Sequence, residues 1–280
     1  MKPIRYALAA LLSCASGSAM ATPASSFWAI NSSVDPGSAY AEQLDASTGA
    51  VIKQINLGSA SLDPQGIAVL ETGTGYFVSA ADGNIRSFNT TSGVVSASVT
   101  PTGHATFGAL SIDNTGFWVN DAEGGNKAFH ITFSGVQDKA VTLTNCGSYC
   151  TGIEAFSRGG HEYLIANREA LGNPATYDLY DTNGNLITAG LITGVANGTG
   201  IAYDPSRDEF FVADALDNVV DIFSGTGVAL GSLTLGNPVP DTGFGQRVVT
   251  DLAFAVPEPA SMLVLATAFG GLGLVRRRRA

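Results

Sequence analysis

Short apolar and aromatic segments recur along the chain at nearly regular intervals. Five of them begin with an aromatic residue, and their starting points lie 49, 41, 46 and 47 residues apart. Runs of β-branched and aromatic residues bounded by glycine, asparagine and serine are typical of β-strands. The five strands predicted in this way are Phe27–Ile30, Tyr76–Ser79, Phe117–Asn120, Tyr163–Ala166 and Phe210–Ala213.

Each of these strands has regular companions. Two alternating segments around a glycine turn follow it, and a short strand of small residues precedes each of the last four. A repeat of about 40–50 residues with four strands per unit indicates a β-propeller. The sequence therefore predicts an all-β fold, with a β-propeller domain over residues 22–255. The small-residue strands are Gln65–Val69, Phe107–Ser111, Thr151–Ala155, Thr199–Tyr203 and a final copy, Thr250–Phe254.

The order of the strands predicts how the ring closes. The region starts with the second strand of a blade and ends with a first strand, so Val249–Phe254 should pair beside Phe27–Asn31. Such closure removes exposed sheet edges, which promote aggregation. We expect five four-stranded blades. A sixth, degenerate blade and a pair of β-sandwiches are the alternatives.

One unit resembles a known group of propellers. The segment Gly200–Ala215, GIAYDPSRDEFFVADA, resembles NHL-type and gluconolactonase-like propellers. This resemblance implies a metal in the central channel and, as an alternative function, a metal-dependent lactonase-like hydrolase. Glu154 and Asp251 stand where other units carry alanine or glycine, and carboxylates are ligands that Ca²⁺ accepts. Two carboxylates are too few for a calcium cage, so the competing interpretation is that they point to solvent at the channel mouth.

The first 21 residues have the order of a secretory signal peptide. Two basic residues precede an apolar run, and Ala19 and Ala21 form a small-x-small cleavage site. We expect signal peptidase to cut here, so that the mature chain begins at Thr22. A lipidated Cys14 is the alternative, because the residues before it form a loose lipobox.

An apolar segment with a basic end closes the sequence. The 16 residues from Ala260 to Val275 hold no charge, which is short for a membrane helix unless the arginine stems that follow snorkel. Basic flanks stay in the cytoplasm, so the propeller should lie outside a single transmembrane helix. The predicted cytoplasmic anchor consists of Arg276, Arg277, Arg278 and Arg279.

Three features in strict order distinguish the C-terminal segment, residues 256–280. Pro257, Glu258 and Pro259 precede the apolar stretch, which precedes the arginine cluster. This arrangement resembles the PEP-CTERM sorting signal of Gram-negative bacteria. The resemblance implies that a membrane-embedded exosortase recognises the motif and releases or transfers the body to the cell surface or an extracellular matrix. Prolines on both sides of Glu258 hold the motif extended, as a processing enzyme requires.

The region between the two predicted processing segments is strongly acidic. Residues 22–255 contain 8 Lys and Arg against 23 Asp and Glu, which gives a formal charge of −15. Because binding to phosphate needs a basic face, this balance argues against a nucleic-acid partner.

The mature chain keeps two cysteines, Cys146 and Cys150. Export implies an oxidising compartment, so we predict a disulfide that staples a surface loop. Zinc is the alternative, but the sequence has no second cysteine pair and no histidine at a ligand spacing.

Motifs for catalysis are missing from the sequence. It has no Gly-x-Ser-x-Gly elbow, phosphate loop or dinucleotide fingerprint, and its three histidines, His104, His130 and His161, fall in different units. Short polar residues end four of the aromatic strands, and we expect them to cap the turns that follow. They are Asn31, Asp121, Asn167 and Asp214.

These observations predict an exported binding or scaffold protein rather than an enzyme. Exopolysaccharide or another surface protein is the partner that the PEP-CTERM resemblance suggests. The metal-dependent hydrolase, with Ca²⁺ in the channel, remains the alternative.

Overall fold

The computed structural model describes residues 25–31, 39–58, 62–101, 107–121, 125–146, 150–168, 174–215, 217–236 and 248–257. The predicted signal peptide and the predicted transmembrane helix with its arginine tail lie outside these residues. Within the described part of the chain, no helix has the length and apolar character needed to cross a membrane.

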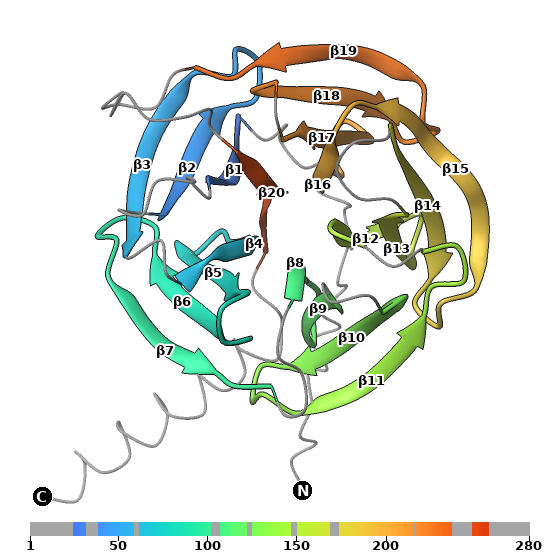
Figure 1. Cartoon of the computed structure of the whole chain (residues 1–280). Coiled ribbons are helices and arrows are strands. Elements are labelled where there is room, and N and C mark those ends of the chain that lie inside the picture. The colour runs from blue at the N-terminus through green and yellow to red at the C-terminus, as the bar shows by residue number, and fades with distance from the viewer. Residues whose placement is uncertain are drawn as a thin grey trace, which may run out of the picture.

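Five antiparallel sheets of four strands each stand around a common axis (Figure 1). We number these sheets as blades 1 to 5, and name the strands of each from the axis outwards. Blade 1 consists of β20 (Val249–Ala253), β1 (Ser26–Asn31), β2 (Ala39–Asp45) and β3 (Val51–Gly58). Blade 2 consists of β4 (Pro64–Leu70), β5 (Thr74–Ser79), β6 (Ile85–Asn89) and β7 (Val95–Val99). Blade 3 consists of β8 (Phe107–Ile112), β9 (Gly116–Asp121), β10 (Lys127–Thr132) and β11 (Gln137–Thr142). Blade 4 consists of β12 (Ile153–Arg158), β13 (His161–Asn167), β14 (Ala175–Asp181) and β15 (Leu186–Val195). Blade 5 consists of β16 (Gly198–Asp204), β17 (Glu209–Asp214), β18 (Val219–Ser224) and β19 (Ala229–Thr234).

The ring closes as the strand order predicts. β20 pairs antiparallel with β1, with Trp28 opposite Ala253 and Ala29 opposite Leu252. The two ends of the described chain therefore complete one blade between them, and the fold is a five-bladed propeller. Aromatic packing reinforces this closure, because the ring of Phe27 lies 5.6 Å from Phe211 and 6.0 Å from Phe254.

A two-residue strand, β21 (Ala255–Val256), was not expected from the repeat. It pairs in parallel with the end of β4, placing Val256 beside Leu70. The Glu71 amide also donates a hydrogen bond of 2.9 Å to the Val256 carbonyl. Ordered pairing thus reaches Val256, one residue into the segment predicted as the sorting signal.

The hydrophobic core consists of five clusters, and each fills the space between two neighbouring blades. Trp28 and Trp118 are both buried in these clusters, as expected for residues on the repeating aromatic strand. At two glycines of the inner-strand region the neighbouring inner strand approaches so closely that no side chain would fit. A Cβ on Gly66 would overlap the backbone of β8, and one on Gly152 would overlap Thr199 of β16.

The connections between successive strands lie at the two ends of the propeller. We call the end with the first-to-second and third-to-fourth strand connections the turn face, and the opposite end the loop face. Connections on the turn face have at most five residues between strands. Those on the loop face range more widely, from two residues between Val195 and Gly198 to fourteen between Thr234 and Val249.

Candidate functional site

The two carboxylates predicted near the axis are both buried there. Asp251 lies on β20, and its Oδ2 accepts hydrogen bonds from the amides of Ile67 (3.0 Å) and Leu110 (3.2 Å). These donors belong to the inner strands of blades 2 and 3, so one side chain joins three blades. The side chain of Asp251 is fully buried, and its Oδ1 has no hydrogen-bond partner among the described residues.

Glu154 makes the corresponding contacts on the other side of the axis. Its Oε2 accepts a hydrogen bond of 2.7 Å from Ser111, and its Oε1 accepts one of 3.4 Å from the Tyr203 amide. The Ser111 hydroxyl in turn accepts the Ala155 amide at 2.9 Å. Together the two carboxylates link the inner strands of all five blades, instead of pointing to solvent at the channel mouth.

Burial dominates the electrostatics of this pair. Removal from water raises the pKa of Glu154 to about 8, against the opposing effect of its hydrogen bonds from Ser111 and Tyr203. Burial also raises the pKa of Asp251 well above its usual range, and the nearby Glu154 charge adds to this rise. Both groups are therefore held toward their protonated forms near neutral pH.

The prediction of a metal at these carboxylates rests on the pair alone. Within the described residues, no three His, Cys, Asp or Glu side chains are grouped so that they could hold a metal ion. Calcium takes six to eight oxygen ligands. Three of the four carboxylate oxygens at the axis already accept hydrogen bonds from neighbouring strands. These hydrogen bonds join the blades.

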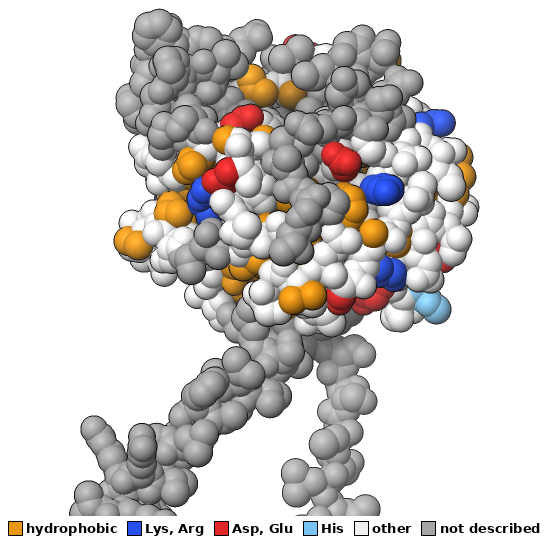
Figure 2. Space-filling view, turned by 60° about the horizontal axis from the view of Figure 1, so that its bottom comes forward, with side chains coloured by type: hydrophobic (Ala, Val, Ile, Leu, Met, Phe, Trp, Pro, Cys, Tyr) orange, Lys and Arg blue, Asp and Glu red, His pale blue; other side chains and the backbone are white. Residues whose placement is uncertain are grey.

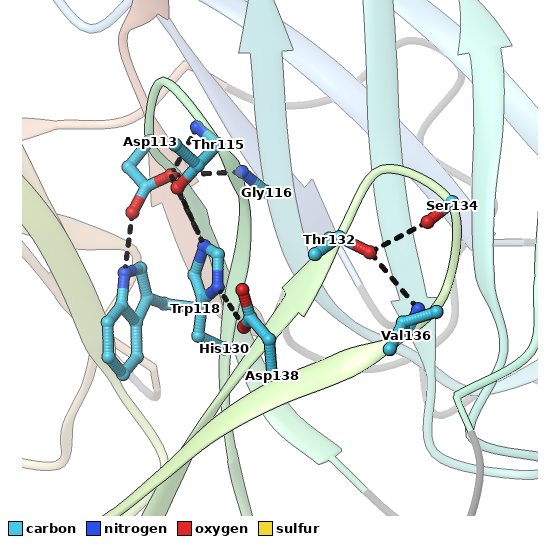
Figure 3. Close-up of polar contacts among 9 residues, drawn as sticks. All are labelled: Asp113, Thr115, Gly116, Trp118, His130, Thr132, Ser134, Val136 and Asp138. Atoms are coloured by element: carbon cyan, nitrogen blue, oxygen red, sulfur yellow. Dashed lines mark hydrogen bonds and ion pairs between the residues drawn. The ribbon is translucent and has the colours of Figure 1, made fainter.

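A second polar cluster lies in blade 3, at the turn face (Figure 3). His130 of β10 stands between two carboxylates, with Nδ1 2.6 Å from Asp138 Oδ1 and Nε2 3.3 Å from Asp113 Oδ1. Asp113 lies in the turn between β8 and β9, and its Oδ2 accepts the Trp118 indole N–H at 2.9 Å. The Thr115 hydroxyl is 3.2 Å from His130 Nε2 and 2.7 Å from Asp113 Oδ1. We call these five residues the His130 cluster.

In the His130 cluster the imidazole and the carboxylates stabilise each other's charged forms. Burial of the imidazole opposes protonation, but hydrogen bonds and charge from Asp113 and Asp138 outweigh it and raise the pKa of His130. Burial likewise opposes ionisation of Asp113, yet its bonds from His130, Thr115 and Trp118 hold its pKa well below the usual range. The cluster ties the inner turn of the blade to its outer strand.

The spacing of the three histidines does not reveal this cluster, because the partners of His130 are carboxylates of its own repeat unit. Thr115 and Trp118 follow Asp113 closely, but His130 and Asp138 are 17 and 25 residues away from it. A search within one repeat unit for a histidine flanked by carboxylates would have found the set.

The predicted disulfide between Cys146 and Cys150 is present. Both cysteines are buried in the core between blades 3 and 4, and the three residues between them lie outside the described part of the chain. The backbone after it is also held, because Asn120 Nδ2 donates to the Cys150 carbonyl. Asn167 Oδ1 accepts the amides of Thr151 (2.7 Å) and Gly152 (3.0 Å).

The four strand-ending polar residues therefore do not share one role. Asp214 accepts the Asp217 amide at 3.3 Å, which is the turn cap expected for it. Asn167 instead holds the start of its own inner strand, and Asn31 Nδ2 donates to Glu42 on the neighbouring strand at 3.4 Å.

The C-terminal end of the propeller meets the predicted sorting motif directly. Val256 is the last residue with a strand partner, and Pro257, the last described residue, is exposed. Glu258 and Pro259 lie outside the described residues.

Comparison with known proteins identifies this C-terminal segment. Residues 255–279 match the PEP-CTERM protein-sorting motif. The motif marks an exported precursor that is anchored in the membrane, processed by an exosortase and sorted to the cell surface. No curated protein matches the sequence.

Solved structures show relatives of the fold. A chain in the crystal structure of a nidogen/laminin complex is 10% identical, with a TM-score of 0.54, over 83% of this chain and 99% of that one. Glutaminyl cyclase from Myxococcus xanthus is 13% identical, with a TM-score of 0.48, over 61% of this chain and 70% of that one. At such identities the first likeness concerns the propeller fold alone.

Proposed function

We propose that this protein is a surface-displayed propeller that serves as a binding or scaffold module after exosortase sorting. The observation that carries the proposal is the position of the sorting motif. Strand pairing ends at Val256, and the exposed Pro257 opens the Pro-Glu-Pro motif. A processing enzyme can therefore act on the motif while the propeller stays closed.

The contacts at the axis favour binding over catalysis. Asp251 and Glu154 accept hydrogen bonds from the inner strands of other blades, which gives each carboxylate a structural role. Propellers host both binding proteins and enzymes, so the fold by itself does not choose between them. The structural relative from a nidogen/laminin complex belongs to an assembly of two proteins, which agrees with a binding role for a propeller of this shape.

The mass of the native protein tests the processing. We expect the form at the cell surface to lack residues 1–21 and the tail Arg276–Arg279. A Glu258→Gln variant should accumulate as membrane-bound precursor. Recovery of a single native species that still carries the arginine tail would contradict sorting by an exosortase.

Metal analysis of the same purified protein separates the two functions. The binding module needs no metal, so we expect less than one equivalent of any divalent ion after dialysis. One equivalent of Ca²⁺ that disappears in an Asp251→Asn variant would instead support the hydrolase.

A further inference from the structure

We infer that the anchored precursor holds the propeller with its turn face toward the membrane and its loop face directed away from the bilayer. The inference rests on the membrane anchoring in the proposed function. It follows from the strand topology, the positions of the chain ends and the length of the tether.

Both described ends of the propeller emerge on the turn face. Val256 pairs with Leu70 and accepts a hydrogen bond from Glu71, and these two residues end β4 and begin the turn to β5. At the other end, the Ser25 carbonyl accepts the Ala46 amide at 3.0 Å, beside the turn between β2 and β3. Neither the first nor the last described residue of the chain lies on the loop face.

The tether is too short to turn the propeller over. Three residues, 257–259, separate β21 from the predicted membrane segment that begins at Ala260, and three extended residues span at most about 11 Å. The tether also starts beside an inner strand, close to the axis. To place the loop face on the membrane, the tether would first have to pass across the four strands of a blade, which are spaced about 4.8 Å apart. It would then have to run along about six residues of strand at about 3.3 Å each, so that the whole path is roughly 35 Å long.

The loop face also has the longest connections. Fourteen residues connect β19 to β20 and ten connect β11 to β12, whereas no turn-face connection exceeds five. The strand ends joined by the longest connections therefore lie on the face that the anchor turns away from the bilayer.

The net charge of the propeller gives it no electrostatic attraction of its own to an anionic bilayer. Residues 22–255 carry a formal charge of −15, which anionic lipid headgroups repel. On the side of the molecule in Figure 2, the described hydrophobic side chains lie in small separate groups rather than in one broad patch. The covalent tether, attached at the turn face, is therefore what sets the orientation.

Cysteine accessibility in the full-length protein tests the inference. Ala81→Cys places an exposed thiol on the loop face, and Glu162→Cys places one on the turn face near the axis. The protein is held in membrane vesicles with the propeller outside and treated with a bulky polyethylene-glycol maleimide or with a small maleimide. We expect the bulky reagent to label the Ala81→Cys variant several-fold faster, while the small reagent labels both at similar rates.

Two further variants make the result decisive. Asp217→Cys on the loop face and Asn183→Cys on the turn face should repeat the difference. Insertion of a long Gly/Ser segment after Pro259 should abolish the difference, because a flexible tether lets the propeller tumble. Bulky labelling of Glu162→Cys as fast as Ala81→Cys, with the native tether, overturns the inference. Failure of the full-length protein to sediment with membranes overturns the anchoring itself, and so separates the two outcomes.

Discussion

At the scale of single residues, Glu154, Asp251 and His130 show how far the sequence reveals a buried ionisable group of the propeller. Glu154 and Asp251 could be singled out from the sequence because each breaks a repeat of small residues. Their partners could not, since amides of Ile67, Leu110 and Tyr203 come from inner strands that only the closed ring brings together. His130 does not stand out when the repeat units are compared with one another, because its environment comes from two carboxylates within its own blade.

Glu154 predicts a loss of stability at alkaline pH. Its folded pKa is about 8, above the ordinary value of 4.5, so the folded state binds the proton more tightly than the unfolded chain. Its contribution to stability is complete below about pH 4.5 and is lost as the pH rises to 8, by an amount on the order of 4 kcal/mol. Denaturant unfolding of Glu154→Gln should show a much flatter decline from pH 5 to pH 9. A wild-type protein equally stable at both pH values would show that the carboxylate is not buried as described.

The raised pKa of His130 predicts a second pH dependence of stability, which a His130→Gln variant tests. Because its folded pKa is raised, the charged imidazole stabilises the fold fully below about pH 6.5, and this contribution disappears as the pH rises through the folded pKa. His130→Gln should therefore cost about 2 kcal/mol at pH 6 and clearly less at pH 9. Thermal melting at the two pH values measures the difference. An equal cost at both would mean that the cluster stabilises the blade through packing alone.

At the scale of elements, one turn recurs in all five blades. Each third-to-fourth strand turn contains a glycine with φ between +70° and +86°: Gly49, Gly93, Gly135, Gly184 and Gly227. A Cβ on each would come within 3.2 Å of the outer strand of the preceding blade. The sequence showed these glycines as turn formers. Their second task, close packing against the neighbouring blade, depends on how blades stack and could not be predicted from a single repeat.

Substitution of Gly227 and of Gly194 distinguishes the effect of backbone conformation from the effect of packing against the neighbouring blade. Both have φ near +80°, but a Cβ on Gly227 would overlap the Leu191 carbonyl, whereas nothing lies within 4 Å of one on Gly194. Gly194→Ala should cost about 1 kcal/mol for the left-handed backbone alone. Gly227→Ala should cost about 2–4 kcal/mol, because the overlap adds to the same backbone term. Chemical denaturation of the two variants checks this order, and equal costs would dismiss the contact between blades.

At the scale of the whole molecule, the offset of one strand decides the architecture. The repeat order predicted that the last inner strand would complete the first blade, and the register of β20 against β1 confirms it. The short β21 could not be foreseen, because two residues carry no periodic signal and the pairing with β4 is parallel. The propeller therefore extends one residue further than the repeat indicated.

Truncation tests ring closure. A chain that ends at Val248 loses β20 and β21, which exposes the edges of β1 and β4 and the apolar face shared by Phe27 and Phe211. We expect it to aggregate or to lack a cooperative unfolding transition. A chain that ends at Pro257 keeps every described strand and should unfold in one transition. Equal melting temperatures for the two chains would show that the terminal strand does not close the ring.

Sharing blade 1 between the two chain ends also fixes an order of events in time. Secretion delivers the N-terminus first, so β1 crosses the membrane early and waits without its inner neighbour. That neighbour, β20, crosses almost last, a few residues ahead of the sorting motif. Blades 2 to 5 can form meanwhile from consecutive strands, but the ring stays open until translocation is nearly finished. A chain that stalls before residue 249 lacks its closing strand and its sorting motif together, so an incompletely secreted protein is left both unfolded and unsorted.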